Sequence, residues 1–291
     1  MSPRHIALAV LIAAVWGFNF IAIKLAVTEA PPFILTAARF MLAAVPAIFF
    51  VARPKEKWTW IASFGLMLGV GQFGFLFLAV RLGLPVGLTS LVMQTQAFFT
   101  MALAWALMGE VPLAKQTWGA VIAFAGIALI AYARWTGSQA LPLILCLMAA
   151  AGWAMANIIS KMAKPANTLS FVIWSSLFVP LPMLALSFIF EDHSQVLGVL
   201  THPSLQVIAA LFYLAFLSTL FGYAAWNYLF NVYSAATIAP FSLLIPIFGI
   251  VGGVVVFGER FDNLEIAGGG LIIAGLLFSN FGGRLFPLPA S

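Results

Sequence analysis

Residues 5–27 read HIALAVLIAAVWGFNFIAIKLAV, an almost unbroken apolar run with Lys24 inside it. A run of this length can cross a bilayer as a helix, because a spanning helix needs about 20 predominantly apolar residues. It is also longer than the apolar part of a secretory signal peptide, which has roughly 7–15 residues. We therefore expect a first membrane-spanning helix that is retained in the mature protein.

The composition extends this expectation to the whole chain. Of 291 residues, 64% are hydrophobic and only 7% are charged, whereas an ordinary soluble domain has about 25% charged residues. This excludes a soluble globular enzyme. Long apolar runs also disfavour an outer-membrane barrel, whose strands alternate apolar and polar residues. The net charge of +5 comes from residues between apolar runs, so it indicates membrane topology and a lipid-bilayer partner, and no nucleic-acid partner is expected.

Breaks that carry turn residues or charges separate the apolar runs, so we predict an all-α membrane protein with ten transmembrane helices. The expected helices cover residues 5–27, 33–51, 61–80, 86–108, 117–133, 140–162, 169–190, 205–230, 235–257 and 264–281.

Basic residues predict the orientation, because they are enriched in cytoplasmic loops. With both termini in the cytoplasm, that side carries Arg4, Arg53, Lys55, Lys57, Lys115, Lys161, Lys164 and Arg284. The outer side carries the smaller set of Arg81, Arg134 and Arg260, with Lys24 and Arg39 close by. This asymmetry favours an N-in and C-in topology.

The chain also repeats itself. Trp16 and Lys24 recur as Trp153 and Lys161, and the pair Gly109-Glu110 recurs as Gly258-Glu259. We predict two five-helix repeats, residues 1–138 and 139–291. Because five is odd, the second repeat enters the membrane from the opposite side. Such inverted repeats are typical of alternating-access transporters.

The sequence offers little for catalysis or metal binding. His5, His193 and His202 lie at the ends of spans or in loops, and Cys146 is the single cysteine. No Asp or Glu lies deep in an apolar run, and the familiar zinc, nucleophile and phosphate-loop motifs are absent. We expect no enzymatic activity, no cofactor and no metal. Coupling to protons or sodium usually needs an intramembrane acid or histidine, so an uncoupled facilitator or exchanger is favoured.

Two predicted helices present an indole, an amide and a lysine along one face. The first carries Trp16, Asn19, Phe20 and Lys24, and its counterpart carries Trp153, Asn157 and Lys161. Both indoles lie near mid-span. Two interpretations are open: interhelical packing with Asn as a polar contact, or the wall of a central cavity that suits a zwitterion. The lysines could extend to the lipid headgroups or attract a substrate carboxylate, and the same alternatives hold for Arg39.

Further candidates lie on four other predicted helices. In the helix 86–108, Gln94 and Gln96 point about 200° apart if the helix is regular, so only one can face a cavity. We prefer the face of Gln94, which also holds Ser90, Phe98 and Trp105. The remaining candidates are Gln72, which shares a stripe with Gly65 and Gly69, the group Tyr223, Trp226 and Asn227, and the mid-span Pro246. Helix packing is an alternative for Gln72 and for the group of Tyr223, Trp226 and Asn227, whereas Pro246 could be a hinge or a substrate-facing kink.

These features resemble a known family. The ten helices, the repeat and the Gly-Glu pairs followed by Gly and Ala-Gly are similar to the EamA branch of the drug/metabolite transporter superfamily. The stretches WGFNF at 16–20, RFML at 39–42, PAIFFVARP at 46–54 and QTQAFFT at 94–100 resemble the bacterial O-acetylserine/cysteine exporters. The YddG-type amino-acid exporters share the architecture. One departure is that the first helix has no glutamate, which the four-helix multidrug members of the superfamily use for proton exchange.

The resemblance implies a multi-pass protein of the bacterial inner membrane that exports amino acids and related small metabolites by alternating access. A central cavity between the repeats would bind this small-molecule substrate. The main alternative is proton-coupled export of other metabolites or drugs, and a membrane enzyme or lipid-handling protein is a more distant one. The sequence leaves open whether the protein is a monomer or a homodimer.

Overall fold

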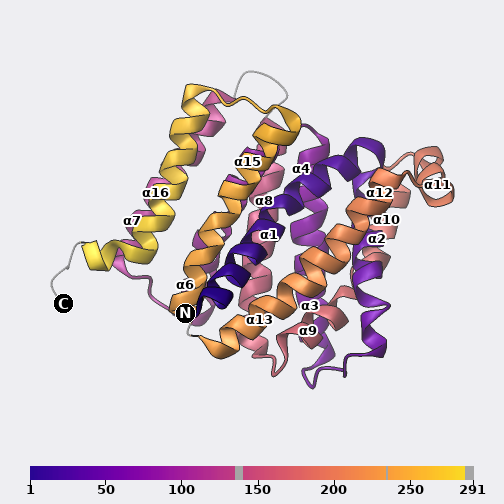
Figure 1. Cartoon of the computed structure of the whole chain (residues 1–291), viewed down its shortest axis with the longest axis horizontal. Helices are drawn as coiled ribbons and strands as arrows, with labels where there is room; N and C mark the ends of the chain where they lie inside the picture. The colour runs from indigo at the N-terminus through magenta and orange to yellow at the C-terminus, as the bar shows by residue number, and fades with distance from the viewer. Residues whose placement is uncertain (135–139, 234, 286–291) are drawn as a thin grey trace.

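A computed structural model describes residues 1–134, 140–233 and 235–285, and every regular element in those ranges is a helix (Figure 1). Ten helical segments are long and apolar enough to cross a membrane. Their positions agree with the ten predicted spans to within a few residues. The predicted all-α membrane fold is therefore confirmed.

In the first half of the chain, the first and fifth spans are continuous α-helices, and the other three spans are interrupted. The elements are α1 (Pro3–Glu29), α2 (Pro32–Ala44) with the 3₁₀ turn η1 (Ala47–Phe49), α3 (Trp58–Leu66), η2 (Met67–Gly74), α4 (Phe75–Arg81), α5 (Val86–Met93), α6 (Gln96–Met108) and α7 (Ala114–Ala133).

The second half follows a similar pattern. It contains α8 (Ala140–Ala163), α9 (Thr168–Ser176), α10 (Pro180–Phe190), α11 (His193–Thr201), α12 (Leu205–Phe212), η3 (Tyr213–Phe221), α13 (Gly222–Val232), α14 (Ala235–Ile238), η4 (Ala239–Leu244), α15 (Ile245–Phe257) and α16 (Asn263–Leu285).

The third and eighth spans have π-helical middles, η2 and η3. In a π-helix the backbone hydrogen bonds skip one residue more than in an α-helix, and such segments occur often at functional sites. The ninth span changes from the 3₁₀ helix η4 to α15 at Ile245-Pro246. These irregular middles place polar groups at mid-span, where they can face a cavity.

Two interhelical loops begin with the glycine of a Gly-Glu pair. Gly109 ends α6 with a φ of 70°, and Gly258 ends α15 with a φ of 62°. Glycine adopts this left-handed conformation without the steric cost that a Cβ brings. The two repeated pairs therefore end two spans in the same way.

The short helix α11 was not predicted. It begins at Asp192, whose carboxylate accepts hydrogen bonds from the backbone N–H groups of Ser194 and Gln195. A local cap of this kind starts a helix without a long apolar run. The segment between the seventh and eighth spans is therefore partly helical.

Helices α7 and α16 pair along one edge of the bundle (Figure 1). A Cβ built on Gly126 would lie 2.4 Å from the carbonyl oxygen of Gly268, and one on Gly275 would lie 2.4 Å from that of Gly119. Only residues without side chains allow backbones to approach this closely. The glycines in these two spans therefore serve helix packing.

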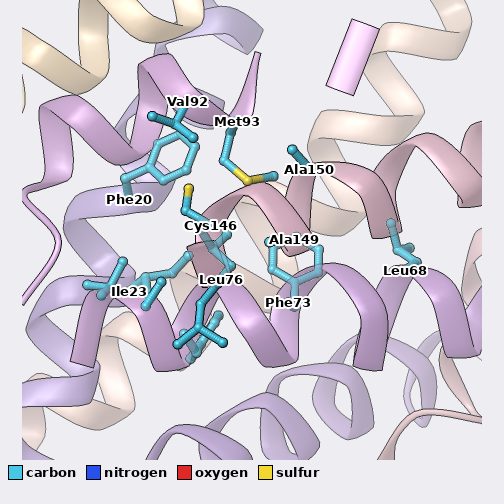
Figure 2. Packing of buried hydrophobic residues seen from close by; sticks show 14 of the residues in the cluster. Phe20, Ile23, Leu68, Phe73, Leu76, Val92, Met93, Cys146, Ala149 and Ala150 are labelled. Carbon is cyan, nitrogen blue, oxygen red and sulfur yellow. The ribbon is translucent and has the colours of Figure 1, made fainter. Parts of the chain in front are cut away.

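The buried core of the bundle contains the single cysteine (Figure 2). Cys146 of α8 is fully buried and lies among Phe20, Ile23, Val92 and Met93, which come from α1 and α5. Its thiol is free. Cys146 is thus a small packing residue where three spans meet.

Candidate functional site

A cavity of about 980 Å³ lies within the bundle. Its lining reaches the surface at Ala166, Asn167 and Tyr228, which are exposed, and it extends inward to the buried Leu76 and Met93. The exposed residues lie just before α9 and at the end of α13. The N-terminus lies at the same face of the molecule (Figure 1). The cavity therefore opens toward the side of the N-terminus.

One wall of the cavity is a cluster of aromatic and amide side chains held against η3. The indole N–H of Trp16 donates to the carbonyl oxygen of Ser218 at 3.0 Å. The Trp16 ring lies 5.1 Å from Trp226 and 5.7 Å from Tyr223, centroid to centroid. The hydroxyl of Ser218 donates to Oδ1 of Asn19 at 2.8 Å. These contacts fix an aromatic surface that could attract an ammonium group.

The facing wall comes from α8 and from the fourth span. Trp153 and Asn157 of α8 both line the cavity. The side-chain amide of Asn157 donates to Oε1 of Gln96 at 2.8 Å and to Oγ1 of Thr100 at 3.2 Å. Amide groups that are already paired within the protein are held in one orientation, so they present a defined polar surface to a ligand.

The prediction that only one of Gln94 and Gln96 can face the cavity is wrong, because both line it. The prediction assumed a regular helix through residues 86–108. The fourth span instead breaks into α5 and α6, with a turn at Gln94-Thr95. The turn rotates the second half of the span relative to the first and brings both side chains to the same side.

A buried arginine also borders the cavity. Arg39 of α2 is only 2% exposed, and its guanidinium carbon lies 3.9 Å from the ring centroid of Phe73. Nη2 donates to Oγ1 of Thr219 at 3.3 Å, whereas Nε and Nη1 have no hydrogen-bond partner. Oε1 of Gln72, next to Phe73 in the chain, is likewise unpartnered. The cavity thus holds a cation with free hydrogen-bonding capacity.

Most of the predicted site residues lie in the cavity wall. The residues placed there are Trp16, Asn19, Phe20, Gln72, Gln94, Trp153, Asn157, Tyr223 and Trp226. Gln72 lines the cavity, although Gly65 and Gly69, predicted to lie on the same helix face, pack closely against Ser175 and Val179. Their contribution to substrate binding remains a prediction.

Six other predicted residues are not part of the described cavity wall. Lys24 is half-buried outside it, and Lys161 forms an ion pair with Glu110 at the surface. Phe98 packs against Phe124, and Trp105 is 59% exposed on the outside of the bundle. The remaining two, Ser90 and Pro246, meet where α5 packs against α15.

The hydroxyl of Ser90 donates to the carbonyl oxygens of Gly87 and Pro246. Helical-wheel reasoning placed Ser90, Phe98 and Trp105 with Gln94, and the break after α5 invalidates that grouping for Phe98 and Trp105. A last predicted residue, Asn227, belongs to α13, but its side chain lies outside the described part of the structure.

Sequence reasoning passed over several residues that line the cavity. They are Phe64, Leu68, Phe73, Leu76, Met93, Ser218 and several residues near α9. Arg39 also lines the cavity; the sequence left it open between the lipid headgroups and a substrate carboxylate, and a charged side chain inside an apolar segment is costly and marks a functional hypothesis by default. Ser218 carried no such signal, because its role depends on the π-helical backbone around it.

Charged groups also join the spans at the ends of the bundle. Each oxygen of the Glu259 carboxylate accepts a backbone N–H at the start of α5, from Val86 at 2.5 Å and from Gly87 at 2.9 Å. Glu191 makes the same pair of contacts with the first N–H groups of α2. Glu110, the sequence counterpart of Glu259, contacts Lys161 instead, and both side chains are 48% exposed. The glutamates of the two Gly-Glu pairs thus make different contacts.

Within the described residues, no three His, Cys, Asp or Glu side chains lie close enough together to hold a metal ion. Among the described residues that line the cavity there is no Asp, Glu, Lys or His. The chemistry available to a ligand there is aromatic contact, amide and hydroxyl hydrogen bonding, and one guanidinium.

A bundle of ten apolar helices around a central cavity with indole, amide and guanidinium side chains in its wall is the arrangement expected of a membrane transporter. The sequence model of the EamA-like transporter family matches residues 4–132 and again residues 140–281. The chain therefore belongs to the EamA-like transporter family. It is a transporter and not an enzyme, and it is a multi-pass protein of the bacterial inner membrane.

Curated relatives share nearly the full length of the chain. A probable amino-acid metabolite efflux pump of Salmonella typhimurium is 40% identical, with 98% of this chain and 97% of the relative aligned. A protein of the same description in Escherichia coli K12 is 38% identical over the same shares. The uncharacterized transporter YoaV of Bacillus subtilis is 24% identical over 93% of this chain and 94% of its own.

A solved crystal structure shares the fold. It superposes with a TM-score of 0.65 at 18% sequence identity, and the alignment covers 97% of this chain and 99% of the other. The overall fold of this chain is thus similar to one determined by experiment.

Proposed function

We propose that the protein exports amino acids and related small metabolites across the inner membrane by alternating access, without ion coupling. The observation that carries the proposal is the cavity of about 980 Å³, which is lined by amides, indoles and a guanidinium from both halves of the chain and reaches the surface on the side of the N-terminus. The relatives that are 40% and 38% identical, both probable amino-acid metabolite efflux pumps, support the substrate class.

The volume and lining of the cavity suit a small zwitterion with an apolar side chain. About 980 Å³ lies at the upper end of the usual range for ligand sites. The cluster of Trp16, Tyr223 and Trp226 offers aromatic faces to an ammonium group. Apolar residues such as Phe64 and Leu68 offer contact for a side chain. A substrate of this class would find both polar and apolar partners.

Alternating access needs two halves that can exchange roles, and we propose that residues 1–138 and 139–291 are such inverted repeats. The recurrence of the π-helical middles and of the Gly-Glu turns supports this proposal. With both termini in the cytoplasm, the cavity opens inward and the Glu259 contact closes the outer end. The different contacts of Glu110 and Glu259 support such an asymmetric state.

The ionisable side chains of the cavity wall support uncoupled transport. A proton- or sodium-coupled carrier usually exposes a carboxylate or histidine to the pathway, and the part of the cavity wall that the structure describes has neither. Transport would then follow the substrate gradient, as facilitated export or as exchange.

Counterflow into proteoliposomes tests the proposal. Vesicles are loaded with unlabelled neutral L-amino acids or O-acetyl-L-serine, and labelled substrate is added outside at equal pH and salt. Saturable uptake above that of empty liposomes is expected. Absence of uptake for every compound would contradict the substrate class. Uptake that requires a pH or sodium gradient would contradict uncoupled transport.

A further inference from the structure

Arg39 sets the charge of the cavity. It is the one ionised side chain among the described lining residues, and it is 2% exposed. Removing a cation from water costs several kcal/mol unless an anion and hydrogen bonds compensate. A membrane protein retains such a residue where it serves transport or binding.

The internal contacts of Arg39 leave much of the guanidinium unused. Its one hydrogen bond, to the hydroxyl of Thr219, is long at 3.3 Å, and Nε and Nη1 have no partner. The Phe73 ring covers one face of the group, which provides a cation–π contact but accepts no hydrogen bond of ordinary strength. A planar fork with free N–H groups matches the two oxygens of a carboxylate.

The chain treats another buried arginine differently. Arg134, at the end of α7, forms an ion pair with Glu265, and both side chains are at most 10% exposed. The protein thus supplies a carboxylate to Arg134 itself. Arg39 has none among the described residues, although it lies beside an open cavity.

We propose that Arg39 binds the carboxylate of the transported molecule, with the unpartnered Oε1 of Gln72 as a nearby acceptor for the substrate's donor groups. This inference rests on the proposed function and narrows it: the substrate must carry a carboxylate. An amine or a cationic drug, which lacks that group, is repelled by the guanidinium.

The residues next to Arg39 provide the contacts expected for the ammonium group of the substrate. Thr219, which holds Arg39, follows Ser218, whose carbonyl holds Trp16. The anion-binding guanidinium and the aromatic cluster are therefore attached to adjacent positions of η3. The carboxylate and the ammonium of an α-amino acid are separated by a single carbon, so we expect one molecule to engage the guanidinium and the aromatic cluster together. Free α-amino acids fit better than either their esters or their amines.

The first arm of the test uses the unaltered protein. Binding of a panel of neutral L-amino acids, including O-acetyl-L-serine, is compared with binding of their methyl esters and decarboxylated amines, by calorimetry in detergent. The acids are expected to bind about ten- to a hundredfold more tightly, because a charge-assisted bidentate contact is lost in the analogues. Equal affinity of acid and ester would overturn the inference.

The second arm uses variants. In R39Q the affinity for the acid is expected to fall to that for the ester, while the affinity for the ester stays the same or rises, because the cation that repels it is gone. R39K keeps the charge but not the fork, so it should lie between R39Q and the unaltered protein. The matched control is R81Q, which removes an exposed arginine that contacts the backbone of Val27 and Thr28 outside the cavity. It should bind like the unaltered protein.

The outcomes separate the two proposals. If the unaltered protein exchanges amino acids in counterflow but R39Q loses acid and ester binding equally, the carboxylate site is wrong and the export function stands. If the unaltered protein neither binds nor exchanges any amino acid, the proposed function itself fails. Should R39Q not fold, the acid–ester comparison on the unaltered protein still decides.

Discussion

The contact between Glu259 and the start of α5 leads to the sharpest prediction for the conformational cycle. The carboxylate accepts the N–H groups of Val86 and Gly87, which otherwise have no partner within the helix. Replacement of Glu259 by Gln keeps one acceptor oxygen, removes the negative charge and places an NH₂ group against a backbone donor. We expect Glu259→Gln to favour opening of this end of the cavity.

The structure sets the size of the effect. A hydrogen bond to a charged group contributes about 1.5–3 kcal/mol, and a carboxylate at a helix N-terminus about 0.3–1 kcal/mol more. Glu259 is only half-buried and Gln retains one bond, so we discount the loss to about 1–2 kcal/mol. That corresponds to a roughly 5- to 30-fold rise in the population in which α5 and α15 separate.

Cysteine labelling measures that population. Ser90 is fully buried between α5 and α15, and the native Cys146 is fully buried as well, so a cysteine at Ser90 is the reporter against a low background. The rate at which a maleimide labels S90C in detergent should rise about 5- to 30-fold on Glu259→Gln. An unchanged rate would refute the idea that Glu259 holds this end closed.

A second glutamate supplies the matched control. Glu191 accepts the first N–H groups of α2 in the same way as Glu259 does for α5, but it lies away from the α5–α15 contact. Glu191→Gln should leave the labelling of S90C unchanged. If both variants accelerated labelling equally, general destabilisation would explain the result, and the specific role of Glu259 would be disproved.

Three further predictions concern packing, pH and the aromatic wall. Gly126→Leu should lower stability by about 1–3 kcal/mol, seen as a lower Tm, because a Cβ there meets the backbone of α16 at 2.4 Å, whereas Gly270→Ala, with nothing within 4 Å, should change little. The pKa of Asp192 is held below its ordinary value, because the hydroxyl of Ser194 and the backbone N–H groups of Ser194 and Gln195 donate to its carboxylate. The ionised carboxylate therefore stabilises α11 above the ordinary pKa, and this stabilisation is lost as the pH falls through the lowered pKa. Faster hydrogen exchange in α11 at acidic pH would show the loss. Trp16→Ala should reduce counterflow more than expression, while Trp105→Ala, on the outside of the bundle, should affect neither strongly; equal losses would contradict the cavity role of Trp16.

The spans could be predicted because hydrophobic length alone determines them. Apolar runs of about 20 residues have few alternatives to a membrane helix, and Gly109 and Gly258 mark helix ends by a conformation that favours glycine. The indoles and amides of the first and sixth spans were recognised as candidates because polar groups at mid-span are costly. These inferences depend only on local sequence.

The features that the sequence could not predict depend on contacts between distant segments or on irregular backbone. A wheel drawn with a constant 100° per residue could not bring Gln94 and Gln96 to one side, because the turn at Thr95 leaves no mark in composition. The π-helical Tyr213–Phe221 reads like any apolar helix. The pairing of Glu259 with Val86 joins residues that are far apart in the chain. Sequence patterns give no direct signal for any of these features.

The paired helices α7 and α16 contribute none of the residues that line the cavity in the described part of the chain. They meet backbone to backbone along their glycines, and their outer side chains are largely exposed to the surroundings of the bundle. If the cavity is the substrate route that we propose, α7 and α16 lie outside it. An antibody epitope, a fluorescent label or a fusion partner attached to this helix pair would therefore not obstruct the cavity.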